Sequence, residues 1–193
     1  TTFTERNKRV NSVYGTATLS YANKIFLDVT GRNDWSSTLP SGNNSFFYPS
    51  VSTSFILSDL LRLPEQISFA KLRASWAQVG NDTDPYKTAK YYNTSAFPGS
   101  ASVSPTLYNA RFKPEISNSI EVGLDWRMFK QRFGLDLAFY NNITRNQILD
   151  VPMDQTTGYT KATMNSGKVR NRGIELQLDG TPVKTKNFTW NST

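Results

Sequence analysis

Hydrophobic and polar residues alternate strictly along the stretch from Ser117 to Tyr140. Every even-numbered position from Ile120 to Met128 is apolar, and every odd-numbered position between them is charged or glycine. After a short interruption at residues 129–132, a second run from Phe133 to Tyr140 alternates in the same way. Successive side chains of a β-strand point to opposite faces, so this pattern predicts an antiparallel hairpin with one apolar face and one polar face.

Similar alternation runs through most of the chain and predicts an all-β, antiparallel fold. We expect eight strands, near residues 10–21, 25–33, 46–57, 67–79, 117–128, 133–143, 169–180 and 187–193. The connections alternate between short and long, with long ones at residues 33–45, 80–115 and 141–168. Short links join neighbouring antiparallel strands, so we expect an up-and-down order whose first and last strands are unpaired edges.

The apolar face has two candidate environments, lipid or the core of a soluble protein. Each arm of the hairpin has roughly the 9–11 residues that a tilted strand needs to cross a bilayer. Alternation alone favours a transmembrane β-barrel and a soluble β-sandwich about equally. The separation of short from long connections favours the barrel, because tight periplasmic turns and long extracellular loops are typical of that fold. The alternative is an extracellular β-sandwich that binds carbohydrate or mediates adhesion.

The amino-acid composition excludes several kinds of functional site. The 193 residues include neither cysteine nor histidine, which removes the commonest acid–base catalyst and all thiolate sites. Because no nucleophile–base pair or phosphate-binding glycine loop can be assembled, we predict a non-enzyme with no cofactor and no metal. Asp82 and Asp84 lie in an Asn-rich loop, where paired carboxylates are more often turn formers than calcium ligands. The net charge of +7 is scattered along the chain, which disfavours a nucleic-acid partner.

Five segments, in order, resemble the barrel of SusC/RagA-type TonB-dependent outer-membrane transporters. They are Tyr48–Phe55 (YPSVSTSF), Lys71–Asn81 (KLRASWAQVGN), Lys113–Phe129 (KPEISNSIEVGLDWRMF), Leu149–Tyr159 (LDVPMDQTTGY) and Asn165–Leu178 (NSGKVRNRGIELQL). The family shows similar motifs in the same order and at similar spacing. One such match would be weak evidence, but five in register are strong.

The resemblance implies that the chain supplies about eight strands of a larger, roughly 22-stranded barrel. Such a barrel is a multi-pass protein of the cell outer membrane that imports a nutrient, an oligosaccharide or a peptide, with energy passed on by TonB. The implied partners are the remainder of the barrel and its plug, a SusD-like surface lipoprotein that closes the extracellular mouth, TonB and the lipid bilayer. The sequence shows no plug domain, TonB box, signal peptide or terminal aromatic residue, so we expect an internal segment from the middle to late part of the barrel.

Three groups of residues are predicted to carry the function. The polar face is expected to line a water-filled lumen as a charge ladder through Arg73, Glu121, Asp125, Arg127, Asp136 and Glu175. The apolar face is expected to meet lipid through Val122, Leu124, Trp126, Leu135, Leu137, Ile174 and Leu176. The loop at residues 80–115 is expected to lie outside the cell and to contact the lid, the substrate or itself through Tyr86, Tyr91, Tyr92, Phe97 and Tyr108. Of these contacts we favour the lid, because aromatic residues are enriched at protein interfaces.

Overall fold

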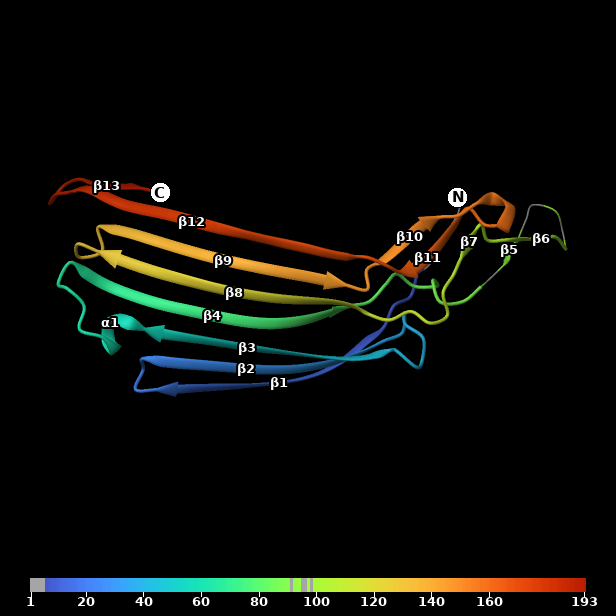
Figure 1. Cartoon of the computed structure of the whole chain (residues 1–193), viewed down its shortest axis with the longest axis horizontal. Helices are drawn as coiled ribbons and strands as arrows, with labels where there is room; N and C mark the ends of the chain where they lie inside the picture. The colour runs from blue at the N-terminus through green and yellow to red at the C-terminus, as the bar shows by residue number, and fades with distance from the viewer. Residues whose placement is uncertain (1–5, 91, 95–96, 98) are drawn as a thin grey trace.

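A computed structural model describes residues 6–90, 92–94, 97 and 99–193 of the chain. Eight antiparallel strands form one continuous sheet in the order β1-β2-β3-β4-β8-β9-β12-β13 (Figure 1). Their bounds are β1 Val10–Tyr21, β2 Ile25–Ser36, β3 Ser45–Ile56, β4 Ile67–Asn81, β8 Glu115–Met128, β9 Phe133–Arg145, β12 Lys168–Lys184 and β13 Thr189–Ser192. Each large strand therefore lies beside the large strands that precede and follow it in the chain. This confirms the predicted antiparallel up-and-down fold, and the sheet is open, with β1 and β13 at its two edges.

One end of the sheet carries the tight turns. The three-residue link between β1 and β2 places Ala22 and Asn23 at φ 51° and 56°, the consecutive left-handed pair at the centre of a type I′ turn. Residues 129–131 between β8 and β9 are also left-handed, with φ between 53° and 65°. The link from β3 to β4 at the same end contains the single-turn helix α1 (Leu57–Leu60). No helix among the described residues has the length and apolar character needed to cross a membrane.

The opposite end of the sheet carries the long connections, which are more ordered than the sequence suggested. Strands β10 (Ile148–Pro152), β11 (Lys161–Asn165) and β7 (Thr106–Leu107) form a three-stranded sheet, with a 3-10 turn at Gln155–Thr157. Strands β5 (Tyr92–Thr94) and β6 (Ala101–Val103) form a hairpin. None of these five short strands is among the eight expected from the sequence. These strands have two to five residues, too few for alternation to be recognised, and β7 pairs in parallel with a strand more than fifty residues later.

The packed interior lies at the loop end rather than beneath the sheet. Phe112, Leu39 and Ala162 are buried there, and Phe112 has no exposed surface. The large sheet itself is a single layer (Figure 1), and its fully buried apolar side chains are the small ones Ala70 and Ala138. The apolar face of the sheet consequently has nothing packed on it within the part of the chain that the structure describes.

Candidate functional site

The strand register divides the large sheet into two chemically different faces. Glu121 on β8 lies opposite Ser75 on β4 and Tyr140 on β9, whereas Val122 lies opposite Ala74 and Phe139. The same alternation continues into β12. It gathers the six residues predicted to line a lumen on one side, here called the charged face. The seven residues predicted to meet lipid share the other side, here called the apolar face.

The apolar face is open to its surroundings. The side chains of Ile174 and Leu176 are 71% and 59% exposed, and Val122 and Leu137 are also exposed. Leu124, Trp126 and Leu135 are half-buried by their neighbours on the same face. Exposed apolar area that is continuous over several strands marks an interaction surface or a membrane.

On the charged face, Arg73 reaches across a whole strand. Its guanidinium donates two hydrogen bonds, of 3.0 and 2.9 Å, to the carboxylate of Asp136. Arg73 is on β4 and Asp136 is on β9, with β8 between them. Glu121 of β8 lies 3.6 Å from the same guanidinium. The crossing depends on Gly123, because a Cβ atom there would lie 2.4 Å from Arg73 Nε, which is closer than van der Waals contact permits.

A second ion pair repeats this arrangement one strand further along. Arg127 on β8 donates hydrogen bonds of 2.8 Å to Asp179 on β12 and of 2.8 Å to Asp125 on its own strand. The strand between them, β9, presents Gly134, where a Cβ atom would lie 2.4 Å from Arg127 Nη1 and 2.5 Å from Asp179. Both arginines therefore lie flat against the wall, each over a glycine.

A third glycine lies beneath a tyrosine side chain. A Cβ atom on Gly173 of β12 would lie 2.6 Å from the Tyr140 hydroxyl oxygen, and the two residues are opposite one another in the register. Sequence reasoning did not include Asp179 among the lumen residues or assign a role to Gly123 and Gly134. The signal was present, since Gly123-Leu124-Asp125 and Gly134-Leu135-Asp136 repeat the same triplet on adjacent strands.

The charged face also contains a polar hollow of about 240 Å³ between β2, β3, β4 and β8. Its lining includes the charged residues Asp28, Lys71, Arg73 and Glu121. Of the six predicted lumen residues, five take part in the two ion-pair groups, and Glu175 lies on the same face outside them. The wall therefore offers charged groups and serine hydroxyls to water.

At the loop end, Tyr86 and Tyr108 line one cavity of about 320 Å³. An ion pair between Lys161 and Asp150, at 2.7 Å, forms another part of the lining. Thr163 donates a 2.6 Å hydrogen bond to the other carboxylate oxygen of Asp150. The hydrogen bond from Lys161, followed by that from Thr163, holds the pKa of Asp150 below its ordinary value of 3.8. The cavity therefore combines two phenol rings with a fixed anion and a fixed cation.

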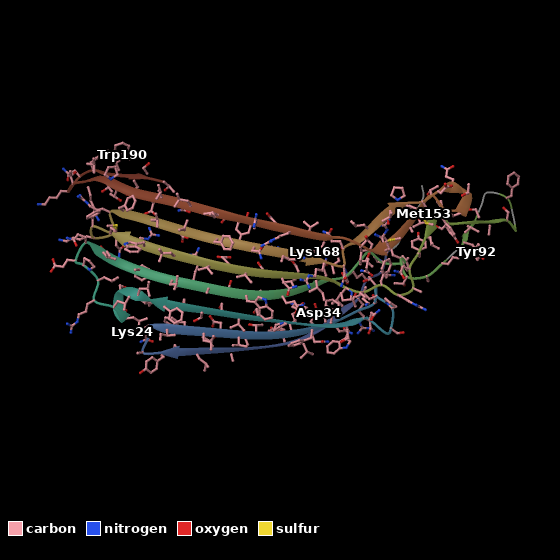
Figure 2. The ribbon with its side chains drawn as sticks, in the orientation of Figure 1. Lys24, Asp34, Tyr92, Met153, Lys168 and Trp190 are labelled. Carbon is pink, nitrogen blue, oxygen red and sulfur yellow. The ribbon has the colours of Figure 1, made fainter. Side chains whose placement is uncertain are left out.

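Tyr92 and Phe97, two other aromatic residues of the predicted loop site, do not line this cavity. Tyr92 is exposed on β5, near the far end of the loop region (Figure 2), and Phe97 is 78% exposed. Tyr91 falls outside the described residues. The five aromatic residues of the predicted loop site are thus not one cluster: Tyr86 and Tyr108 share a cavity, whereas Tyr92 and Phe97 are presented outward.

Asp82, the first residue after β4, ties three segments together. Its carboxylate accepts hydrogen bonds from Lys8, Ser36 and Thr38. Burial raises the pKa of Asp82, but the bonds from Lys8, Ser36 and Thr38 outweigh burial and leave the pKa below 3.8. Asp84 instead pairs with Lys87 at 3.3 Å. Among the described residues, no three Asp, Glu, His or Cys side chains are grouped in a way that could hold a metal ion.

A single-layer antiparallel sheet with one charged and one open apolar face defines a segment of a β-barrel wall. The model of the family described as "TonB dependent receptor-like, beta-barrel" matches residues 1–193, and the chain belongs to this family. Members of the family are receptors and transporters rather than enzymes.

Individual relatives agree with this assignment. The chain is 33% identical over 194 residues to TonB-dependent receptor P26 of Formosa agariphila, covering 96% of this chain and 20% of that protein. It is 26% identical over 211 residues to TonB-dependent receptor SusC of Bacteroides thetaiotaomicron, covering 98% of this chain and 20% of SusC. The solved RagAB peptide transporter matches with a TM-score of 0.85 at 24% identity, over 95% of this chain and 21% of that one. The resemblance to SusC/RagA-type proteins is thereby confirmed, and the chain spans about a fifth of the length of these relatives.

Proposed function

We propose that this chain is part of the wall of an outer-membrane barrel of roughly 22 strands, with its apolar face toward lipid and its charged face toward the lumen. The observation that carries the proposal is the division between faces: exposed Ile174 and Leu176 on one side, the strand-spanning arginines Arg73 and Arg127 on the other. The two edge strands support it further. Each pairs on one side only, and an unpaired backbone group in lipid costs several kcal/mol, so further strands would have to complete the barrel.

The intact barrel would import a nutrient, an oligosaccharide or a peptide, with energy from TonB acting through a plug. A SusD-like lipoprotein would close the extracellular mouth. The support is the relationship to SusC and the shared fold with a protein named as the RagAB peptide transporter. The charged face would border the path that the substrate takes when the plug moves.

The cavity at the loop end is the candidate for first contact with the substrate. Phenol rings such as Tyr86 and Tyr108 pack against the apolar face of a sugar ring or against a peptide side chain. The neighbouring Asp150–Lys161 pair offers a hydrogen-bond acceptor and donors. Both proposed substrate classes use such groups.

The competing function, a soluble adhesive β-sandwich, would need a second sheet on the apolar face. The described residues place none there, because their smaller sheets lie beyond the end of the large sheet (Figure 1). The membrane barrel therefore has the better support.

An uptake assay with the intact transporter tests the proposal. A deletion strain complemented with the wild-type gene should take up labelled oligosaccharide or labelled peptide, and loss of TonB should abolish uptake. The double substitution Tyr86→Ala/Tyr108→Ala should lower uptake without lowering the amount of folded barrel, with Tyr21→Ala, on the apolar face at the turn end of β1, as the matched control. Uptake of both substrates that persists undiminished without TonB would refute the proposed transport function.

A further inference from the structure

The tight turn between β8 and β9 forms a basic cavity with the end of β12. Phe129, Lys130, Arg132 and Lys184 line this space of about 550 Å³, and no carboxylate lines it. Among the described residues, none of these three cations forms an ion pair or a side-chain hydrogen bond. The arginines of the charged face behave differently, since Arg73 and Arg127 both pair with aspartates.

The backbone of this turn is held in place. Phe129 N donates to Gln66 O at 2.7 Å, and Thr181 N donates to Arg132 O at 2.7 Å, so the turn is bonded to the β3–β4 connection on one side and to β12 on the other. Residues 129–131 adopt left-handed φ angles without a glycine, a conformation that costs energy and persists only when its surroundings support it. The cations are therefore brought together by a fixed backbone, and like charges brought together favour an anionic ligand.

A second cavity, of about 470 Å³, adjoins the first through Arg132, which lines both. Phe133, Leu178 and Pro182 contribute apolar lining to this second space, and Asp179, whose charge is paired with Arg127, also lines it. Phe133 and Leu178 both belong to the apolar face, because Leu178 pairs with Leu135 and Phe133 pairs with Met128. A ligand that filled the two spaces would have an anionic end at the cations and an apolar end along the sheet.

Exposed aromatic residues lie at the same end of the sheet as the two cavities, and one of them, Phe129, lines the first cavity. Phe129, Phe188 and Trp190 are each more than half exposed, and Figure 2 places Trp190 at the turn end of the sheet. Aromatic rings next to lysine and arginine are typical of the level at which a membrane protein meets lipid headgroups.

We propose that the turn end of this sheet binds an anionic phospholipid of the inner leaflet. The headgroup phosphate lies against Lys130, Arg132 and Lys184, and an acyl chain follows Phe133 and Leu178. The inference rests on the proposed membrane barrel, because only that orientation brings these residues to a lipid headgroup. Free phosphate would use the cations but leave the adjoining apolar cavity unfilled, so we assign the site to a lipid.

Native mass spectrometry of the intact transporter, released from nanodiscs, tests this assignment. Nanodiscs of phosphatidylglycerol are compared with nanodiscs of phosphatidylcholine, which carries no net charge. The variant Lys130→Gln/Arg132→Gln/Lys184→Gln removes the site, and Arg111→Gln/Lys113→Gln/Lys168→Gln removes the same charge at the loop end. We expect retained phosphatidylglycerol on the wild type, and roughly hundredfold weaker binding for the first variant, since each cation near a membrane surface contributes about a factor of five. The second variant should bind like the wild type.

Several results would overturn the site. Equal retention of the two lipids, equal weakening by both triple variants, or displacement of phosphatidylglycerol by millimolar inorganic phosphate would each do so. If the triple variant fails to fold, the single substitution Lys130→Gln at the exposed turn replaces it in the test. The expected result is about fivefold weaker binding of phosphatidylglycerol. A wild-type protein that does not insert into nanodiscs would refute the barrel and the site together, whereas one that inserts without lipid preference would refute only the site.

Discussion

Arg127 and Asp179 meet at 2.8 Å across a strand to which neither belongs. Their contact exists because the intervening β9 has a glycine, Gly134, at the register position between them. Arg73 and Asp136 cross β8 in the same way above Gly123. Backbone hydrogen bonds join each strand to its neighbours. On the charged face, these two ion pairs also join strands that are not neighbours.

The first prediction concerns these glycines. Gly134→Val places methyl groups where Arg127 and Asp179 meet, so we expect loss of the ion pair and a decrease of about 1–3 kcal/mol in the free energy of unfolding, typical of overpacking. Thermal and urea unfolding of the intact barrel in detergent would measure it. Gly15→Val is the matched control, because a Cβ at Gly15 has nothing within 4 Å. Equal stability of the two variants would show that the crossing contact does not need the glycine.

The second prediction concerns the orientation of the sheet. Leu124→Arg and Leu135→Arg each place a charge on the apolar face, and a charge at the bilayer midplane costs roughly 2–4 kcal/mol. Refolding of the intact barrel into vesicles across a urea series would give the difference in folding free energy. Gln177→Arg on the charged face should cost much less. The proposed orientation fails if Gln177→Arg is the damaging substitution and the two leucine variants fold normally.

The third prediction is a pH dependence of the small sheet at the loop end. The pKa of Asp150 is lowered from 3.8, mainly by Lys161, so the carboxylate stabilises the folded loop above its unfolded pKa. That contribution is lost as the pH falls through the still lower folded pKa. The pKa of Lys161 is raised from 10.5 by Asp150, so its contribution is present below 10.5 and lost as the pH rises through the folded value.

Amide exchange at Val151 and Ala162, which are paired between β10 and β11, would report this behaviour. Protection should be constant from about pH 5 to 9 and should fall in acid below the ordinary carboxylate pKa of about 3.9. Asp150→Asn should lower protection at neutral pH and remove the acid-dependent step. Asp59→Asn at the turn end should leave the profile unchanged. A profile identical in wild type and Asp150→Asn would rule out the ion pair as its source.

The fourth prediction separates the lid from the substrate among the loop aromatics. Tyr92→Ala/Phe97→Ala removes two outward side chains, and aromatic anchors at interfaces often contribute 2 kcal/mol or more each. We therefore expect at least tenfold weaker co-purification of the proposed SusD-like lid. Tyr86→Ala/Tyr108→Ala, in the cavity, should leave the lid bound and lower uptake. The reverse outcome, with the lid lost only when the cavity tyrosines are removed, would exchange the two assignments.

The large sheet was predictable because its signal is local. Alternation such as that from Ile120 to Met128 needs only one strand to be seen, and it places Glu121 and Val122 on opposite faces whatever their neighbours are. The short links likewise required consecutive strands to pair. The fold class and the separation of the two faces could therefore be derived from residues in order along the chain.

The contacts within the site could not be derived in that way. Whether Arg127 reaches Asp179 depends on the register of two strand pairs, β8 with β9 and β9 with β12. If β9 slipped by one residue, Gly134 would no longer lie between Arg127 and Asp179. Alternation along its own strand places Asp179 on the same face as Glu175, but its contact with Arg127 follows only from the register. The pairing of β11 with β7 joins residues separated by more than fifty positions, and the cavity shared by Tyr86 and Tyr108 depends on that long-range packing.

The strand-crossing arginines have a mechanical consequence. To pull β9 away from β8, a force would have to break the Arg73–Asp136 bonds as well as the backbone ladder. To pull β9 from β12, it would have to lift the strand past the Arg127–Asp179 bridge that lies over it. Strands β4, β8, β9 and β12 should therefore rupture together under load, as one block, rather than peel away one at a time.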